Sequence, residues 1–294
     1  MSISVQSIYK SFTGGNRKKE VKHVLQDVSF DVHDGEFVTL LGPSGCGKTT
    51  ILTIIAGFQK QCGGVILVDG KEVSAPGPDR AFVFQNFALL PWLKVGENIM
   101  YPMKKLKLPA YERKEKLREL LEIAQMEDCA DSYVYELSGG MKQRVALLRA
   151  LACDPKVLLM DEPLGSVDYQ MRKLLQKQLE SILHGRNATT LMVTHDVDES
   201  IYLSDRVLVM SREQGRIIAD VRIELPRPRD RANPAFYKYL GELTQLLKTA
   251  LHGEVLNKDD EELLRFIEAS EIAKNSHFQD QGSCESAGTA GTTI

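Results

Sequence analysis

The sequence predicts an α/β fold with a mainly parallel β-sheet. Residues 37–41, 157–160 and 190–194 are short, largely apolar runs with the length of strands that are buried on both faces. Each run is followed, after a turn, by residues with helical spacing. Strands that alternate with helices are joined by crossover connections, and these give parallel sheets with helices on both faces.

Further strands and a helical region follow from the same patterns. The other expected strands are residues 3–9, 24–32, 65–68, 81–84, 206–210 and 216–221. Beyond Gln85 the pattern changes, because Leu117, Leu120, Leu121 and Ala124 recur at helical spacing among charged residues. We therefore interpret about residues 87–154 as a helical insert. The expected helices are 97–107, 111–126, one that ends near 152, a polar one at 169–183 and a short one that ends at 203.

The C-terminal part has a different composition. The segment Pro226-Arg227-Pro228-Arg229 is typical of a boundary or linker. We expect a core domain at 1–225, followed by a linker and two amphipathic helices within 226–274, at about 235–251 and 259–273. Residues 275–294 are rich in Ser, Gly, Thr and Gln, and such a tail cannot bury enough apolar surface to fold.

Composition excludes several classes of protein. The 294 residues are 43% apolar and 26% charged, which is typical of a soluble globular protein. A net charge of −3 gives no sign of nucleic-acid binding. The chain has no apolar run near the roughly 18 residues that span a bilayer and no signal-peptide pattern, so we expect a cytoplasmic protein. Its five cysteines are scattered without CxxC spacing, which indicates reduced thiols rather than disulfides or zinc ligands.

One stretch carries the clearest chemical signal, because it fits the pattern GxxxxGK[ST] between a strand and a helix. Its residues are Gly42, Pro43, Ser44, Gly45, Cys46, Gly47, Lys48, Thr49 and Thr50. The glycines allow backbone N–H groups to surround a phosphate, and the helix N-terminus adds unpaired donors. Lys48 can then reach the β- and γ-phosphates of a nucleotide, and Thr49 can ligate Mg²⁺.

Two carboxylates complete the chemistry expected at this loop. Asp161 ends an apolar strand, so its carboxylate is delivered to the sheet edge where the loop lies, in a position to hold Mg²⁺. Glu162 follows directly and can orient and deprotonate a water molecule in line with the γ-phosphate. Such general-base catalysis contributes about 10²- to 10⁴-fold in rate. The alternative is a solvated strand end.

In chain order, these residues resemble the motifs of ATP-binding cassette (ABC) ATPases. The motifs are Walker A at 42–50, the Q-loop at Gln85, the signature at 137–140, Walker B at Asp161-Glu162, the D-loop at 166–168 and the H-loop at His195. The resemblance covers about residues 1–225. It implies a P-loop NTPase core of the RecA-like type, with an antiparallel β subdomain, an inserted α-helical subdomain and C-terminal helices.

The resemblance also implies a dimer around ATP. Two chains enclose two ATP molecules, and Ser138, Gly139 and Gly140 of one chain close on the phosphate loop of the other. A serine and glycines at a helix N-terminus offer a hydroxyl and backbone donors to a phosphate. Taken alone, the same string is an ordinary N-cap turn. Asp168 is implied to bridge the two subunits near the opposite nucleotide.

Further roles follow from the same resemblance. His195 is implied to contact the γ-phosphate and to hold Glu162 and the attacking water, whereas a lone histidine after a strand is otherwise a plain surface residue. Gln85 is implied to sense the γ-phosphate and to ligate Mg²⁺; its alternative is a strand-end amide. Phe12 matches the aromatic residue that stacks on adenine, with packing in the core as the alternative.

Flanking residues are similar to those of the ATPase subunits of nitrate, sulfonate, taurine and bicarbonate importers. They are residues 77–80, 89–92, 141, 194–199 and 225–229. This implies a cassette at the inner face of the membrane, bound to an integral membrane permease and acting indirectly with an extracytoplasmic substrate-binding protein. An exporter subunit and a soluble ABC ATPase without a transport role are the alternatives. The identity of the transported substrate is not encoded in this chain.

Two features remain open at this point. Cys46 precedes a predicted helix, where the helix N-terminus lowers the pKa of a thiol, but it also fits a permissive loop position. Pro91 and Trp92 are apolar residues in a loop, and contact with a partner and simple packing explain them equally well. Both alternatives depend on how far these side chains are buried.

Overall fold

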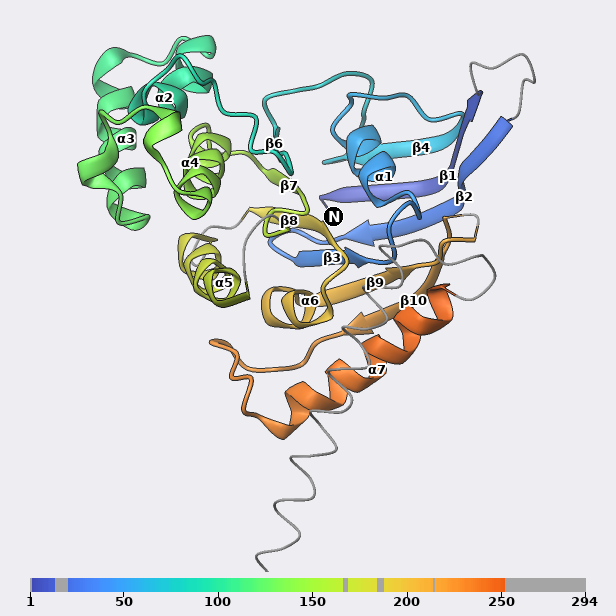
Figure 1. Ribbon diagram of the computed structural model, residues 1–294. Helices are drawn as coiled ribbons and strands as arrows, with labels where there is room; N and C mark the ends of the chain where they lie inside the picture. The colour runs from blue at the N-terminus through green and yellow to red at the C-terminus, as the bar shows by residue number, and fades with distance from the viewer. Residues whose placement is uncertain (1, 14–20, 166–168, 184–187, 214, 252–294) are drawn as a thin grey trace, which may run out of the picture. The chain divides into compact units, whose positions relative to one another are not determined.

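The computed structural model describes residues 2–13, 21–165, 169–183, 188–213 and 215–251. Residues Met1–Ala250 form one compact unit. Several expectations fall outside the described residues: the D-loop residue Asp168, the helix at 259–273 and the tail at 275–294. The fold of the described part combines two β-sheets with helices (Figure 1).

The larger sheet confirms the predicted parallel arrangement. Its strand order is β10 (Ile217–Arg222), β9 (Arg206–Met210), β3 (Phe37–Leu41), β8 (Thr189–Thr194), β7 (Val157–Asp161) and β6 (Arg80–Val83). The strands from β9 to β6 pair in parallel, and β10 joins the edge antiparallel. All residues of β3, β7 and β8 are buried, as expected for strands covered on both faces.

The smaller sheet is antiparallel in every pair. Its order is β2 (Val21–Val32), β1 (Ile3–Thr13), β4 (Gly63–Val68) and β5 (Lys71–Glu72). Asp69 and Gly70 join β4 to β5 with φ of 49° and 73°, which is the conformation that a tight hairpin turn requires. Strand β1 runs to Thr13, so Phe12 lies on it and not after it.

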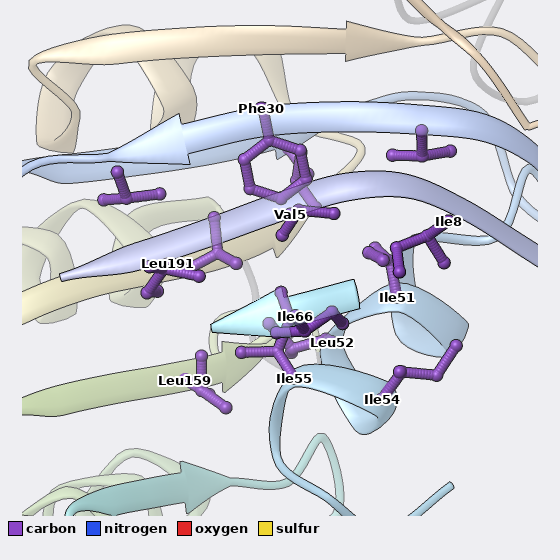
Figure 2. Close-up of a cluster of buried hydrophobic side chains, with 14 of the residues drawn as sticks. Val5, Ile8, Phe30, Ile51, Leu52, Ile54, Ile55, Ile66, Leu159 and Leu191 are labelled. Carbon is purple, nitrogen blue, oxygen red and sulfur yellow. The ribbon is translucent and has the colours of Figure 1, made fainter. Parts of the chain in front are cut away.

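Helix α1 (Lys48–Ile55) lies between the two sheets and fills the core. In Figure 2 its side chains Ile51, Leu52 and Ile55 lie among residues of both sheets, such as Val5 of β1 and Leu159 of β7. These side chains are at most 2% exposed. Because this packing fixes the first turn of α1, it also fixes the loop between β3 and the helix.

The helical insert and the remaining helices match the predicted pattern closely. The helices are α2 (Val95–Lys105), α3 (Ala110–Ile123), α4 (Gly139–Leu151), α5 (Tyr169–Leu183), α6 (Val197–Leu203) and α7 (Pro234–Leu251). Helix α2 packs against α3 and α4, while α6 contacts β3 and β8. Figure 1 shows α1 on one side of the larger sheet and α5 and α6 on the other. Helix α7 buries Phe236, Leu243 and Leu247 within the compact unit.

Candidate active site

The strand order collects the predicted site residues at one edge of the sheet. Four neighbouring parallel strands stand in the order β3, β8, β7 and β6, and they run in the same direction. Their carboxyl ends lead into the loop 42–47, His195, Asp161-Glu162 and Gln85, respectively. In open parallel sheets this edge is where ligands bind.

The loop between β3 and α1 has a shape that only glycine permits at two positions. Gly47 has φ of 104°, and a Cβ built on it lies 2.7 Å from Leu25 Cδ2. A Cβ on Gly42 lies 2.7 Å from the carbonyl oxygen of Met210. A side chain at either position requires its neighbours to move. The loop is thus a backbone cradle that leads into the N-terminus of α1, which suits an anion.

Lys48 is held by the cradle itself. Its Nζ donates hydrogen bonds to the carbonyl oxygens of Gly42, at 2.8 Å, and of Pro43, at 2.9 Å. The side chain is buried, with 5% of the residue exposed. A buried ammonium group bonded to neutral carbonyls is favourable for an incoming anion, because these partners do not compensate its full charge. The loop therefore fits the phosphates of a nucleotide.

Two of the three residues predicted to ligate Mg²⁺, Thr49 and Asp161, lie together. Thr49 Oγ1 donates a hydrogen bond of 2.9 Å to Asp161 Oδ1, although 112 residues separate them. Burial raises the pKa of the Asp161 carboxyl group, the neighbouring Glu162 raises it further, and the bond from Thr49 acts in the opposite direction. A hydroxyl and a carboxylate oxygen are hard donors of the kind that Mg²⁺ prefers.

Glu162 stands between His195 and Gln85. Its Oε1 lies 3.4 Å from His195 Nδ1, which is long for a hydrogen bond, and its Oε2 accepts from Gln85 Nε2 at 3.4 Å. His195 is the main cause that lowers the pKa of Glu162, and the charge of Lys48 lowers it further. Burial acts in the opposite direction but is outweighed. The Glu162 side chain is therefore a carboxylate at neutral pH.

The backbone at Glu162 is strained. Its φ of 42° falls in the left-handed region, which costs a residue with a side chain about 1 to 3 kcal/mol. Two hydrogen bonds hold it there, from its own N–H to the Val193 carbonyl and from the Gly165 N–H to its carbonyl. Strain of this kind collects at functional sites, where the surrounding structure fixes one side chain in one direction.

The signature residues lie on a separate element. Ser138 is the N-cap of α4, and its Oγ accepts a hydrogen bond of 3.3 Å from the Met141 N–H. Ser138 and Gly139 are exposed, while a Cβ on Gly140 would lie 3.3 Å from Leu175 Cδ2. In a single chain the predicted cap therefore presents its exposed end to solvent.

The exposure of three side chains bears on the open alternatives. Phe12 is 42% exposed, with Lys10 Nζ at 5.0 Å from its ring centre, so packing in the core was the wrong alternative. Cys46 is 1% exposed, and burial raises the pKa of its thiol. Of the two alternatives, a thiol pKa lowered by the helix N-terminus is wrong, because desolvation outweighs the nearby positive charge of Lys48. Trp92 is 70% exposed and does not pack in this chain.

Sequence reasoning missed several residues that support the site. Glu199 is buried in the first turn of α6, and Arg149 of α4 donates to the carbonyls of Phe87 and Ala88, just after Gln85. One signal was available: Asp196-Val197-Asp198-Glu199 is a capping-box pattern, which predicts a helix start at Asp196. The contacts of Arg149 have no comparable signal, because its partners are distant in the chain.

The geometry defines a nucleotide-phosphate site with a carboxylate poised next to it, and comparisons with known proteins agree. A family model described as ABC transporter matches residues 25–165. The aliphatic sulfonates import ATP-binding protein SsuB of Bacillus licheniformis is 43% identical over 80% of this chain and 90% of its own length. The bicarbonate transport ATP-binding protein CmpC of Synechococcus elongatus is 39% identical over 87% of this chain but only 39% of its own length.

A solved structure gives the same result. A dimeric, post-hydrolysis state of the ATP-binding cassette MJ0796, bound to ADP and Pi, has a TM-score of 0.66 and 28% identity, and the match covers 76% of this chain and 99% of that one. The chain belongs to the ABC transporter family, and it is an ATPase that uses ATP with Mg²⁺. In the part of the chain that the structure describes, every helix is too short or too polar to span a bilayer.

Proposed function

We propose that this chain is the ATP-hydrolysing subunit of an importer for a small anion. The observation that carries the catalytic part is the meeting of the loop, the Thr49–Asp161 pair and Glu162 at one sheet edge. The transport part is supported by the curated relatives, which are import proteins for aliphatic sulfonates and bicarbonate. The resemblance of the flanking residues to nitrate and taurine importers supports the same class of substrate.

Each residue of the edge has a role in this proposal. The cradle and Lys48 bind the phosphates, and Phe12 offers an exposed ring on which adenine can stack. Thr49, Asp161 and Gln85 hold Mg²⁺, which neutralises charge on the phosphates when it is bound. Mg²⁺ retains ordered water and needs only a few protein ligands, so this small donor set is sufficient.

Glu162 acts as the general base. Its carboxylate accepts a proton from water while the water oxygen bonds to the γ-phosphorus and the bond to the leaving ADP breaks. His195 and Gln85 hold the two oxygens of this carboxylate, and the strained backbone keeps it directed into the site. The low pKa ensures that the base is ionised at neutral pH.

The active unit in this proposal is a pair of cassettes. The exposed Ser138 and Gly139 supply a hydroxyl and helix N-terminal donors that suit a γ-phosphate. The solved structure of MJ0796 with ADP and Pi is dimeric, which supports two chains closing around the nucleotides. Asp168 of the predicted D-loop lies outside the described residues and is proposed, from the family resemblance, to bridge the chains near the opposite nucleotide.

The pair is proposed to drive a separate permease from the inner face of the membrane. Trp92, exposed in the loop after Gln85, is a suitable apolar contact for it. Whole-cell membranes that contain the tagged chain should release, in native mass spectrometry, a complex of two cassettes with a permease. An extracytoplasmic binding protein in the same preparation supports an importer. The import proposal is contradicted if the complex contains no extracytoplasmic binding protein and if its membrane subunits export a labelled solute.

A further inference from the structure

The buried acid Glu199 has no part in the mechanism described so far. It lies in the first turn of α6, three residues after Asp196 and four after His195, and only 2% of it is exposed. Thr194 Oγ1 donates a short hydrogen bond of 2.6 Å to its Oε2. Within the described part of the chain, its Oε1 has no hydrogen-bond partner. A fully buried carboxyl group with one unpaired oxygen is costly, so it needs a reason.

The contacts of Glu199 enclose the turn that carries His195. Thr194 Oγ1 also accepts the N–H of Asp196 at 3.1 Å, so one hydroxyl ties the residues on both sides of the histidine. Asp196 Oδ1 accepts the N–H of Glu199 at 3.0 Å, and Asp196 Oδ2 accepts from Arg172 at 2.8 Å. The imidazole itself contacts only the side chain of Glu162 among these groups.

This arrangement departs from the capping box that the sequence predicts. In a capping box, the acid at the third helical position accepts directly from the N-cap amide. Here Thr194 stands between them, because Asp196 N–H bonds to Thr194 Oγ1 and Thr194 bonds to Glu199. A hydroxyl can donate and accept at once, so Thr194 accepts from the Asp196 N–H while it donates to Glu199, and the three groups form one connected chain.

The surroundings of Glu199 disfavour a negative charge. Burial raises the pKa of Glu199 to about 8, and the carboxylates of Asp196, the N-cap of α6, and Glu162, after β7, raise it as well. The hydrogen bond from Thr194, on β8, and the charge of Arg172, on α5, act in the opposite direction and are outweighed. At neutral pH Glu199 is therefore mainly a neutral acid.

We propose that Glu199 is a positioning residue for His195, acting through Thr194 to hold the turn that keeps the imidazole against Glu162. This rests on the proposed role of His195 in ATP hydrolysis. Loss of the proton places a buried negative charge beside Asp196 and Glu162, which loosens the turn. The chain thereby carries an alkaline limit on hydrolysis that does not come from the residues that touch ATP.

The first test compares pH profiles of full-length wild type and Glu199→Gln, since glutamine mimics the neutral acid. If ionised Glu199 disables the site, wild-type kcat at pH 9 falls about tenfold relative to pH 7. In Glu199→Gln we expect that fall to be absent and the KM for ATP to stay on the wild-type profile. Glu122→Gln, which removes an exposed glutamate of α3, should retain the wild-type fall. An equal alkaline fall in wild type and Glu199→Gln overturns the proposal.

The second test needs no hydrolysis and so stands apart from the proposed function. In the unfolded chain Glu199 loses its proton above the ordinary pKa of a glutamate, whereas the folded chain keeps the proton up to about pH 8. The free energy of unfolding of the wild type should therefore fall as the pH rises from about 5 to 8. The folding constant of Glu199→Gln relative to wild type should grow by up to tenfold per pH unit over this range and level off above it. A constant ratio across this range overturns the proposal.

The third test observes His195 directly. Labelled histidines give imidazole signals in NMR, and His195→Gln identifies the relevant one among the six. In the nucleotide-free chain we expect this signal to move across pH 8 in wild type but not in Glu199→Gln. Thr194→Val, which removes both hydrogen bonds, should shift it at every pH, and Thr194→Ser should restore it. If Thr194→Val leaves the His195 signal in place, the turn does not position His195 and the proposal is overturned. If the NMR shifts occur as expected but the wild-type chain does not hydrolyse ATP, the proposed function fails and the positioning of His195 by Glu199 stands.

Discussion

Lys48 shows how one residue fixes the chemistry of the loop. Its ammonium group is buried and bonded to two backbone carbonyls, so an anion gains charge-assisted bonds without the cost of ordering a mobile side chain. The sequence pattern alone predicted the identity of this residue. The carbonyl partners follow from the loop conformation, which only Gly42 and Gly47 permit.

We expect Lys48→Ala to weaken ATP binding by about 10- to 100-fold. The reason is the loss of one bond from a charged donor, worth about 1.5 to 3 kcal/mol. Isothermal titration with ATP and Mg²⁺ measures it directly. Lys104→Ala, which removes an exposed lysine in the last turn of α2, is the matched control and should bind as wild type does. Equal affinity in both variants contradicts the role of the cradle.

We expect Glu162→Gln to bind ATP within a few-fold of wild type but to lose about 10²- to 10⁴-fold in kcat, because the amide cannot accept the proton of water. Phosphate release in single-turnover and steady-state assays separates the two effects. Because the pKa of Glu162 is lowered, this base stays ionised between pH 6 and 7.5, and its protonation should not reduce the wild-type rate in that range. Rapid hydrolysis by Glu162→Gln removes this residue as the base.

At the scale of single elements, the sequence predicted most strands and helices but not their exact extent. Strand β1 continues to Thr13, four residues beyond the expected end, because bulges at three points break its alternation of apolar and polar residues. Its pairing with β2 continues regardless, with Phe12 opposite Lys22. A period-two pattern cannot report a strand whose register shifts along its length.

Supporting contacts were beyond sequence reasoning for a related reason. Glu199 was visible only as part of a helix-start pattern, which gives no sign that Thr194 lies between it and Asp196. Arg149 reads as one more charged residue of α4. Its partners, Phe87 and Ala88, are about 60 positions earlier in the chain, and only the folded insert brings them together.

Arg149 gives a prediction at this scale, since it ties α4 to the segment after Gln85. It donates to the Ala88 carbonyl at 2.7 Å and the Phe87 carbonyl at 2.9 Å, and both acceptor residues have a left-handed backbone. We expect Arg149→Ala to lower the free energy of unfolding by about 2 kcal/mol, because two bonds that hold a strained turn are lost. Urea denaturation measures this change.

Hydrogen exchange then locates the effect. In Arg149→Ala, amides at 87–93 should exchange faster, and Arg149→Lys should recover only part of the protection because lysine lacks the fork of donors. Arg113→Ala is the control, since Arg113 donates to one carbonyl, of Leu108, elsewhere in the insert. It should leave exchange at 87–93 unchanged. Equal exchange in the Arg149 and Arg113 variants contradicts a tie between α4 and this segment.

At the scale of the whole molecule, strand order is what assembles the site. Strand β8 is later in the chain than β3 and β7, yet it lies between them and so brings His195 next to Glu162. The alternation of strands and helices predicted a parallel sheet but not this order. Family resemblance supplied the roles, and the described residues show that the loop, Asp161, Glu162 and His195 meet at one edge.

The signature residues are free in this chain to contact a second copy. Ser138 and Gly139 lie on α4, exposed, and they are chemically suited to phosphate. Each chain therefore carries one half of the contacts proposed for each ATP. The account as a whole depends on these two halves coming from different copies.

The oligomeric state of Glu162→Gln in the presence of ATP tests this claim most directly. Size-exclusion chromatography with light scattering should give twice the 32.9 kDa of one chain when ATP and Mg²⁺ are saturating, and a single chain without them. Adding Ser138→Arg should prevent pairing while ATP still binds, because the bulky side chain blocks the exposed N-cap. Single chains at every ATP concentration, with ATP bound to Glu162→Gln, contradict the account.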